Sequence, residues 1–235
     1  MRRARALPVV GVIMLRTAFP RPPGDIGNPE TFGGRVLHEI VEAATVERVM
    51  GGDARDPDLA RDFVAARDRL VARGAGMVTT SCGVLVFHQD RLEHGSPVPV
   101  AASALFQLPR RIAELGRVGV MAMDGRSLTP AHLTASGAPA DTPVVGLEQG
   151  DELYRVLRAD SAEVPLDPAR AEADVVAAGR RLVAAHPRLR AVVLECTNLP
   201  PYAATLSRAL ALPVFDILTW LEEVWHDATA SARTA

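Results

Sequence analysis

The chain has 235 residues, of which 48% are hydrophobic and 23% are charged, and its formal net charge is −2. This composition is typical of a globular protein with enough apolar material for a sizeable core. A net charge near zero and an aromatic content of only 4% argue against a nucleic-acid-binding face. No apolar run approaches the roughly 18 residues that span a bilayer, so we expect no membrane contact.

The first predicted element is a buried strand over residues 8–15, PVVGVIML. Basic residues precede this strand, as they precede the apolar part of a signal peptide. However, Arg16 follows the strand directly, and no cleavage site made of small residues comes after it. The two cysteines, Cys82 and Cys196, lie 114 positions apart and do not form a disulfide framework. We therefore expect a cytoplasmic protein with reduced thiols.

The loop that follows, RTAFPRPPGDIGNPETF (16–32), leaves the carboxyl end of this strand. Asn28 before Pro29 is typical of a helix N-cap, and the pattern predicts a helix over 28–44. Since ligands bind beyond the carboxyl ends of parallel strands, Asp25 and Asn28 are candidate site residues. Asp25 is a candidate to orient or activate a nearby thiol.

The rest of the chain alternates short apolar strands with longer helical patterns. Strands separated by helices, with continuous apolar runs, are typical of an α/β fold with parallel sheets covered on both faces. The further predicted strands are 47–50, 76–81, 98–103, 117–123, 142–148, 190–196 and 212–218. The further predicted helices are 56–73, 105–116, 167–186, 202–211 and 216–227.

The chain also repeats itself when Cys82 is aligned with Cys196. In this register three further pairs match: Leu85 with Leu199, Leu92 with Leu206, and Pro99 with Pro213. VGVIM (10–14) likewise resembles VGVMA (118–122). We therefore predict two similar α/β lobes with parallel sheets, each with one cysteine at the same topological place. Residues 1–115 and 212–235 form the first lobe and 116–211 the second.

Each cysteine lies at the carboxyl end of a predicted strand and before a predicted helix. Free N–H groups at a helix start lower the pKa of a thiol and bind carboxylates. Two opposed thiols suit a proton transfer at a carbon beside a carboxylate. Glu195, one position earlier in its strand, should face away. The candidate substrate-binding residues around the thiols are Thr80, Ser81, Gly83, Thr197 and Asn198.

Other roles for the thiols have less support. A single buried cysteine often only packs, but the shared register of two favours function. No C-x-x-C motif indicates a redox pair, and the histidines show no metal-ligand spacing around the cysteines. We therefore expect no metal and no cofactor.

Five stretches resemble the aspartate/glutamate racemase family, within the Asp/Glu/hydantoin racemases: PPGDIGNPETF, TTSCG, LFQLP, ECTNLPPYA and LPVFDIL. The resemblance implies two pseudo-symmetric, Rossmann-like lobes with the active site in the cleft between them. It also implies a cofactor-independent amino-acid racemase, an isomerase, with Cys82 and Cys196 as opposed acid and base. It also implies a small carboxylate substrate, and a homodimer is the family expectation.

The sequence departs from this family at two positions. Asn198 stands where glutamate racemases have histidine, and Gly83 stands where they have asparagine, so glutamate itself is in question. The alternatives are an enzyme resembling maleate isomerase or arylmalonate decarboxylase that acts on a small dicarboxylate, and a ligand-binding protein without turnover.

Overall fold

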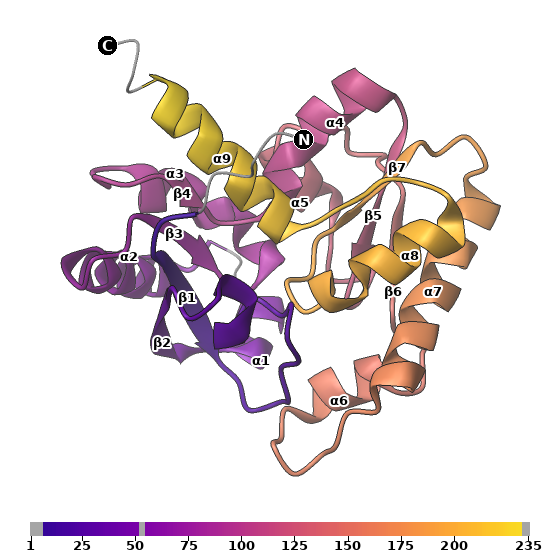
Figure 1. Ribbon diagram of the computed structural model, residues 1–235, viewed down its shortest axis with the longest axis horizontal. Coiled ribbons are helices and arrows are strands. Elements are labelled where there is room, and N and C mark those ends of the chain that lie inside the picture. Colours follow the sequence, from indigo (N-terminus) through magenta and orange to yellow (C-terminus); the bar gives the residue numbers. More distant parts are fainter. Residues whose placement is uncertain (1–6, 52–54, 232–235) are drawn as a thin grey trace.

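The computed structural model describes residues 7–51 and 55–231. The basic residues at the start of the sequence, which we compared with a signal peptide, lie outside these ranges. Two four-stranded parallel sheets form two lobes, which stand side by side in Figure 1, with the orders β2-β1-β3-β4 and β6-β5-β7-β8. Because the two orders are equivalent, the predicted pseudo-symmetric α/β lobes are confirmed. The strands are β1 (Val10–Arg16), β2 (Val36–Thr45), β3 (Met77–Thr80), β4 (Val100–Ala101), β5 (Val118–Ala122), β6 (Val144–Gly146), β7 (Ala191–Leu194) and β8 (Val214–Phe215).

The repeat seen in the sequence is present in the backbone hydrogen bonds. The Val78 amide donates to the Pro99 carbonyl at 2.9 Å, and the Val192 amide donates to the Pro213 carbonyl at 3.0 Å. Each pair joins the cysteine-bearing strand to the last strand of its sheet. The shared register of the two prolines therefore reflects the same parallel pairing in each lobe.

Helices flank both sheets, and the two longest helices begin with the same kind of N-terminal cap. The side chains of Asp56 and Asp167 accept hydrogen bonds from the first turns of α2 and α7, and a proline opens each helix. Such caps satisfy backbone donors that have no partner within the helix. The helices are α1 (Val46–Gly51), α2 (Pro57–Ala72), α3 (Gln89–Glu93), α4 (Leu108–Leu115), α5 (Pro130–Ala135), α6 (Leu153–Ala159), α7 (Pro168–Ala185), α8 (Ala203–Leu210) and α9 (Ile217–Ser231). Short 3-10 helices are η1 (Pro29–Phe32), η2 (Gly83–His88), η3 (Ala104–Gln107) and η4 (Pro200–Tyr202).

Two predictions in the first lobe are wrong. The helix predicted over 28–44 is one 3-10 turn, capped by Asn28 and ended by Gly33 at φ +59°, followed by β2. Parallel pairing of β2 with β1, beginning at Val10 and Val36, satisfies its backbone and overrides the helix-like pattern. The strand predicted over 47–50 is part of helix α1.

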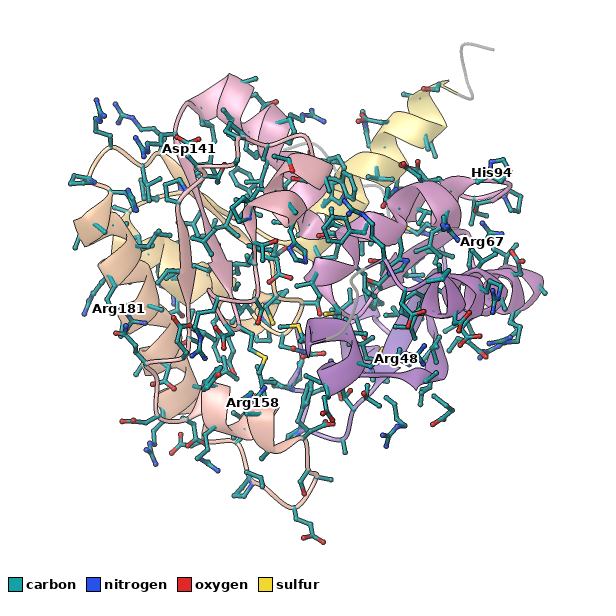
Figure 2. The ribbon with its side chains drawn as sticks, turned by 180° about the vertical axis from the view of Figure 1, so that it is seen from behind. Arg48, Arg67, His94, Asp141, Arg158 and Arg181 are labelled. Carbon is teal, nitrogen blue, oxygen red and sulfur yellow. The ribbon has the colours of Figure 1, made fainter. Side chains whose placement is uncertain are left out.

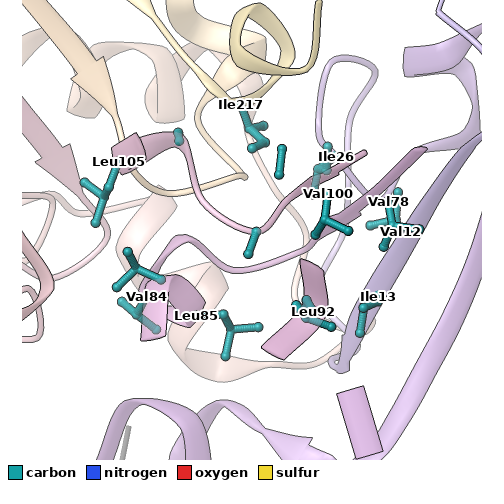
Figure 3. Close-up of a cluster of buried hydrophobic side chains, with 14 of the residues drawn as sticks. Val12, Ile13, Ile26, Val78, Val84, Leu85, Leu92, Val100, Leu105 and Ile217 are labelled. Carbon is teal, nitrogen blue, oxygen red and sulfur yellow. The ribbon is translucent and has the colours of Figure 1, made fainter. Parts of the chain in front are cut away.

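The last part of the chain passes from one lobe to the other. β8 pairs with β7 in the second sheet, although we expected residues 212–218 in the first lobe. Helix α9 then packs on the first-lobe core, where Ile217 lies among buried apolar side chains of that lobe (Figure 3). Burial of Ile217 and Leu221 contributes about 1.5–3 kcal/mol each to folding. The lobe boundaries as a whole stay a prediction.

Charged side chains lie mostly on the outside. Figure 2 shows His94 and Asp141 near the edge of the molecule, and both are exposed, as is Arg158. Arg67 is an exception, since it is 4% exposed and donates to the carbonyl of Leu92. Within the described ranges, none of the helices has the length and apolar character needed to cross a membrane.

Candidate active site

One cavity lies where the cysteine-bearing strands of the two lobes end. It is partly open to solvent. Both lobes contribute to its walls, as the carboxyl ends of their parallel strands predict. The sequence-predicted site residues that line it are Ser81, Cys82, Gly83, Cys196, Thr197 and Asn198.

The two thiols occupy equivalent positions. Cys82 follows β3 and precedes η2, and Cys196 follows β7 in the same way. Each sulfur accepts a hydrogen bond from the backbone two residues later, from Val84 for Cys82 and from Asn198 for Cys196. The fold therefore brings both predicted cysteines to one cavity.

The acidity that we expected of these thiols is wrong. Burial, followed by the neighbouring carboxyl of Glu195, raises the pKa of Cys82 to about 12 and raises that of Cys196 well above its usual range. The backbone N–H of Val84 and the charge of Arg21 lower the pKa of Cys82, but by less. One N–H from a short 3-10 turn does not offset the loss of water around a buried thiolate. In the free protein both thiols are therefore protonated at neutral pH.

Asp25 reaches the second cysteine through Asn198. Asp25 is 1% exposed, and its carboxylate accepts hydrogen bonds from Arg21 and from the amide side chain of Asn198, both at 2.7 Å. The amide oxygen of Asn198 in turn accepts from the Cys196 thiol at 3.4 Å. Because Asp25 fixes the orientation of this amide, it also holds the Cys196 proton in one direction. The asparagine that departs from the racemase pattern is the link in this chain of bonds.

Three predicted substrate-binding residues do not line the cavity: Asp25, which acts through Asn198, and Asn28 and Thr80, which shape the backbone. Asn28 caps η1 through Glu30 and donates to the Arg21 carbonyl at 2.7 Å. The Thr80 hydroxyl donates to the Ala102 carbonyl at 2.7 Å. Both residues therefore support the loops that carry the site.

Ser81 and Thr197 lie at the cavity and join the two lobes. The Thr197 hydroxyl donates to the Ser81 carbonyl at 2.7 Å, and the Ser81 hydroxyl accepts from the Leu15 amide at 2.9 Å. Their hydroxyl groups are thus engaged in holding the cysteine loops together.

Glu195 is the main residue that sequence reasoning misplaced. We expected it on the far face of its strand, but β7 ends at Leu194, so strand alternation does not extend to it. Its side chain lines the cavity and the residue is 3% exposed. Burial raises its pKa to about 8. A carboxyl group directly before a strand-end cysteine was the signal that could have indicated this position.

The remaining cavity wall divides into charged and apolar parts. Arg21 stacks over the Phe19 ring, 4.4 Å from its centre, and both come from the loop after β1. At another side, Arg126 donates to Asp124 and holds the pKa of Asp124 at about 2, so this carboxylate is ionised. Apolar lining is supplied by Val46, Met50, Val84, Met123, Leu128 and Leu157. Among the described residues, no group of three or more His, Cys, Asp or Glu side chains offers a set of metal ligands.

We expect Asp25→Asn to destabilise the protein by about 1–3 kcal/mol, because it leaves the buried side of Arg21 without its counter-charge. Guanidinium denaturation would measure the loss, with Glu30→Gln on the exposed side of the same loop as the control. Unchanged stability of Asp25→Asn would show that this network does not hold the loop.

Sequence comparison relates the chain to a group of lyases, although no family model matches it. It is 31% identical to dimethylsulfoniopropionate lyase 5 of Emiliania huxleyi (strain CCMP1516) over 96% of its own length. It spans only 46% of that relative. It is 28% identical to the dimethylsulfoniopropionate lyase of Durusdinium sp. clade D, over 89% of this chain and 71% of that one.

Structural comparison identifies the fold. A variant of arylmalonate decarboxylase superposes with a TM-score of 0.61 and 16% identity, over 97% of this chain and 95% of the other. Allantoin racemase from Pseudomonas fluorescens gives a TM-score of 0.55 and 16% identity, over 96% and 91%. The chain has the fold of the Asp/Glu/hydantoin racemase superfamily, as its motifs indicated.

The expected activity, however, is wrong. Relatives that are 28–31% identical over about nine-tenths or more of the chain are named as lyases, which contradicts an amino-acid racemase and the isomerase class. The five sequence motifs correctly indicated the fold, but they did not indicate which reaction the relatives of this chain catalyse.

Proposed function

We propose that this chain is a lyase that splits dimethylsulfoniopropionate into dimethyl sulfide and acrylate. The observation that carries the proposal is the likeness, over almost the whole chain, to proteins named as lyases of this compound. The cavity with its two thiols supports it, since proton removal beside a carboxylate is the chemistry that such an elimination needs.

The substrate's structure defines the reaction. It carries a carboxylate at one end and a positively charged dimethylsulfonium group at the other, separated by two CH₂ groups. A base takes a proton from the CH₂ beside the carboxylate, and the C–H electron pair becomes the new C=C bond. The C–S bond then breaks and its electron pair leaves with sulfur. One acrylate, one neutral dimethyl sulfide and one proton result, so atoms and charges balance.

The two kinds of cavity wall match the two ends of this molecule. Arg21 supplies positive charge for the carboxylate. The sulfur-bearing side chains of Met50 and Met123 suit two methyl groups that carry a delocalised positive charge. The ionised Asp124 adds a negative charge on the same cavity.

We assign the base to Cys82. The Cys196 thiol donates to Asn198, an arrangement that favours its protonated form, whereas Arg21 lowers the pKa of Cys82. A bound sulfonium adds a second positive charge and favours the Cys82 thiolate further. The Cys82 proton passes to solvent as substrate binds, and the thiolate then takes the proton from carbon.

The direct test is to incubate the purified chain with dimethylsulfoniopropionate at neutral pH. We expect dimethyl sulfide in the headspace and acrylate in solution in equal amounts, measured by gas chromatography and NMR. Boiled protein and Cys82→Ala are the controls. Release of neither product above the boiled control would overturn the proposal.

We also propose that the chain is cytoplasmic and forms a homodimer, as its composition and family resemblance led us to expect. Light scattering of the purified chain would give its mass, and a monomer at micromolar concentration would contradict the dimer.

A further inference from the structure

The carboxyl group of Glu195 has a position in the cavity that the reaction above does not use. Its negative charge acts on both thiols, since it raises the pKa of each. The residue is 3% exposed. Burial alone shifts the pKa of this carboxyl group, with no hydrogen bond or charge of the described residues contributing to the shift. A carboxyl group on the cavity wall that takes no partner from the protein is free to take one from a ligand.

The pseudo-symmetry of the lobes shows that space has been made for this carboxyl group. In the register that aligns the two cysteines, Glu195 corresponds to Ser81, and Gly83 corresponds to Thr197. On one side, the Thr197 side chain fills the junction and bonds to Ser81. On the other side, a Cβ at Gly83 would overlap both the carbonyl oxygen and the carboxyl group of Glu195. The absence of a side chain at position 83 is therefore what admits the Glu195 carboxyl.

We propose that Glu195, as a carboxylic acid, is a catalytic residue that donates a hydrogen bond to the carboxylate of the bound substrate. This inference rests on the proposed function and names the group that would stabilise its transition state.

The chemistry explains why an acid rather than a carboxylate is needed. When the proton leaves carbon, negative charge spreads onto the substrate's carboxylate oxygens, and a donor already in place stabilises it. A hydrogen bond from O–H to a carboxylate is among the stronger ones. An ionised Glu195 would instead repel both the substrate and the Cys82 thiolate. Because burial raises its pKa to about 8, Glu195 is mostly neutral at pH 7.

The pH dependence of the activity follows from the raised pKa of Glu195. The neutral acid is present below pH about 8 and is lost as the pH rises through that value. The other titratable or charged groups on the cavity are Arg21, Cys82, Asp124 and Cys196. Asp124 stays ionised near pH 8, because its pKa is about 2. Loss of thiol protons at higher pH would raise the activity rather than lower it. A fall in activity near pH 8 therefore reports Glu195.

The matched variants are Glu195→Gln, which keeps the shape and an N–H donor but cannot ionise, and Glu195→Ala, which has no donor. We expect Glu195→Gln to stay within about tenfold of the wild-type kcat at pH 7 and to lose the fall near pH 8. We expect Glu195→Ala to lower kcat by about 10²-fold, the usual cost of removing one such donor, with a smaller change in KM. An inactive Glu195→Gln, or one that keeps the fall near pH 8, would overturn the proposal.

A second measurement separates this inference from the lyase proposal. Propionate carries the substrate's carboxylate but no leaving group, and its binding is measured by calorimetry without any turnover. We expect the wild type to bind propionate at pH 6.5 and to lose affinity as the pH passes 8, while Glu195→Gln keeps its affinity. Absence of binding at pH 6.5, or the same pH dependence in both proteins, would refute the role of Glu195 even if dimethyl sulfide is released. The expected pH step in a protein that releases none would uphold Glu195 as a carboxylate-binding acid and refute the lyase.

Discussion

Replacing Cys82 by alanine is expected to lower the rate of dimethyl sulfide release by about 10²–10⁴-fold, the range for loss of a general base. Cys196→Ala is expected to lower it by about tenfold or less, because an elimination needs one base and the Cys196 proton is engaged with Asn198. A two-base racemisation would need both thiols. The unequal effect of the two substitutions is therefore the signature of the lyase mechanism.

Steady-state rates of dimethyl sulfide release would test this, with thermal melting of each variant to show that it folds. Cys82→Ser is a useful companion, because its hydroxyl preserves the shape but is a far weaker acid than a thiol. The assignment of the base would be reversed if Cys196→Ala were the inactive variant and Cys82→Ala the active one.

The substitution Gly83→Ala is expected to destabilise the protein by about 3 kcal/mol or more and to abolish activity. The added Cβ would meet the carbonyl oxygen and the carboxyl group of Glu195 closer than real Cβ contacts occur. The backbone oxygen belongs to the second lobe and cannot rotate away. Relief of the overlap therefore requires the two cysteine loops to separate.

Guanidinium denaturation of the wild type and of two alanine variants would measure this effect. Gly34→Ala is the control, since Gly34 has open space around it but a φ of +77°, and its replacement should cost only about 1–2 kcal/mol. Equal losses for Gly83→Ala and Gly34→Ala would show that the interlobe contact at Gly83 is not tight. A double variant, Gly83→Ala with Glu195→Ala, should recover only part of the stability because the carbonyl oxygen remains.

Much of the architecture could be predicted from the sequence because it depends on local patterns. Continuous apolar strands such as 76–81 and 190–196 indicated parallel sheets, and the repeat around the cysteines indicated two equivalent lobes. Strand β2 was the exception. Its apolar spacing resembles a helix, and only its pairing with β1 makes it a strand.

The reaction could not be predicted from the apolar periodicity and the internal repeat. Motifs around Cys82 and Cys196 belong to a fold that supports several reactions, and the choice among them depends on the side chains that line the cavity. Those side chains come from loops of both lobes. Asp124, which we assign to the sulfonium end of the substrate, stands in none of the motifs quoted from the sequence.

By itself the sequence determined the α/β class, the two lobes and the place of each cysteine at a strand end, because apolar periodicity and internal repeats are properties of neighbouring residues. Only the tertiary structure decided that the thiols are protonated, that Asn198 bonds to Asp25 from 173 positions away, and that Glu195 turns into the cavity beside Gly83. The physical reason is burial. The protonation and orientation of a polar group depend on how much water the whole fold removes from it, and the residues that exclude that water are distant in the sequence.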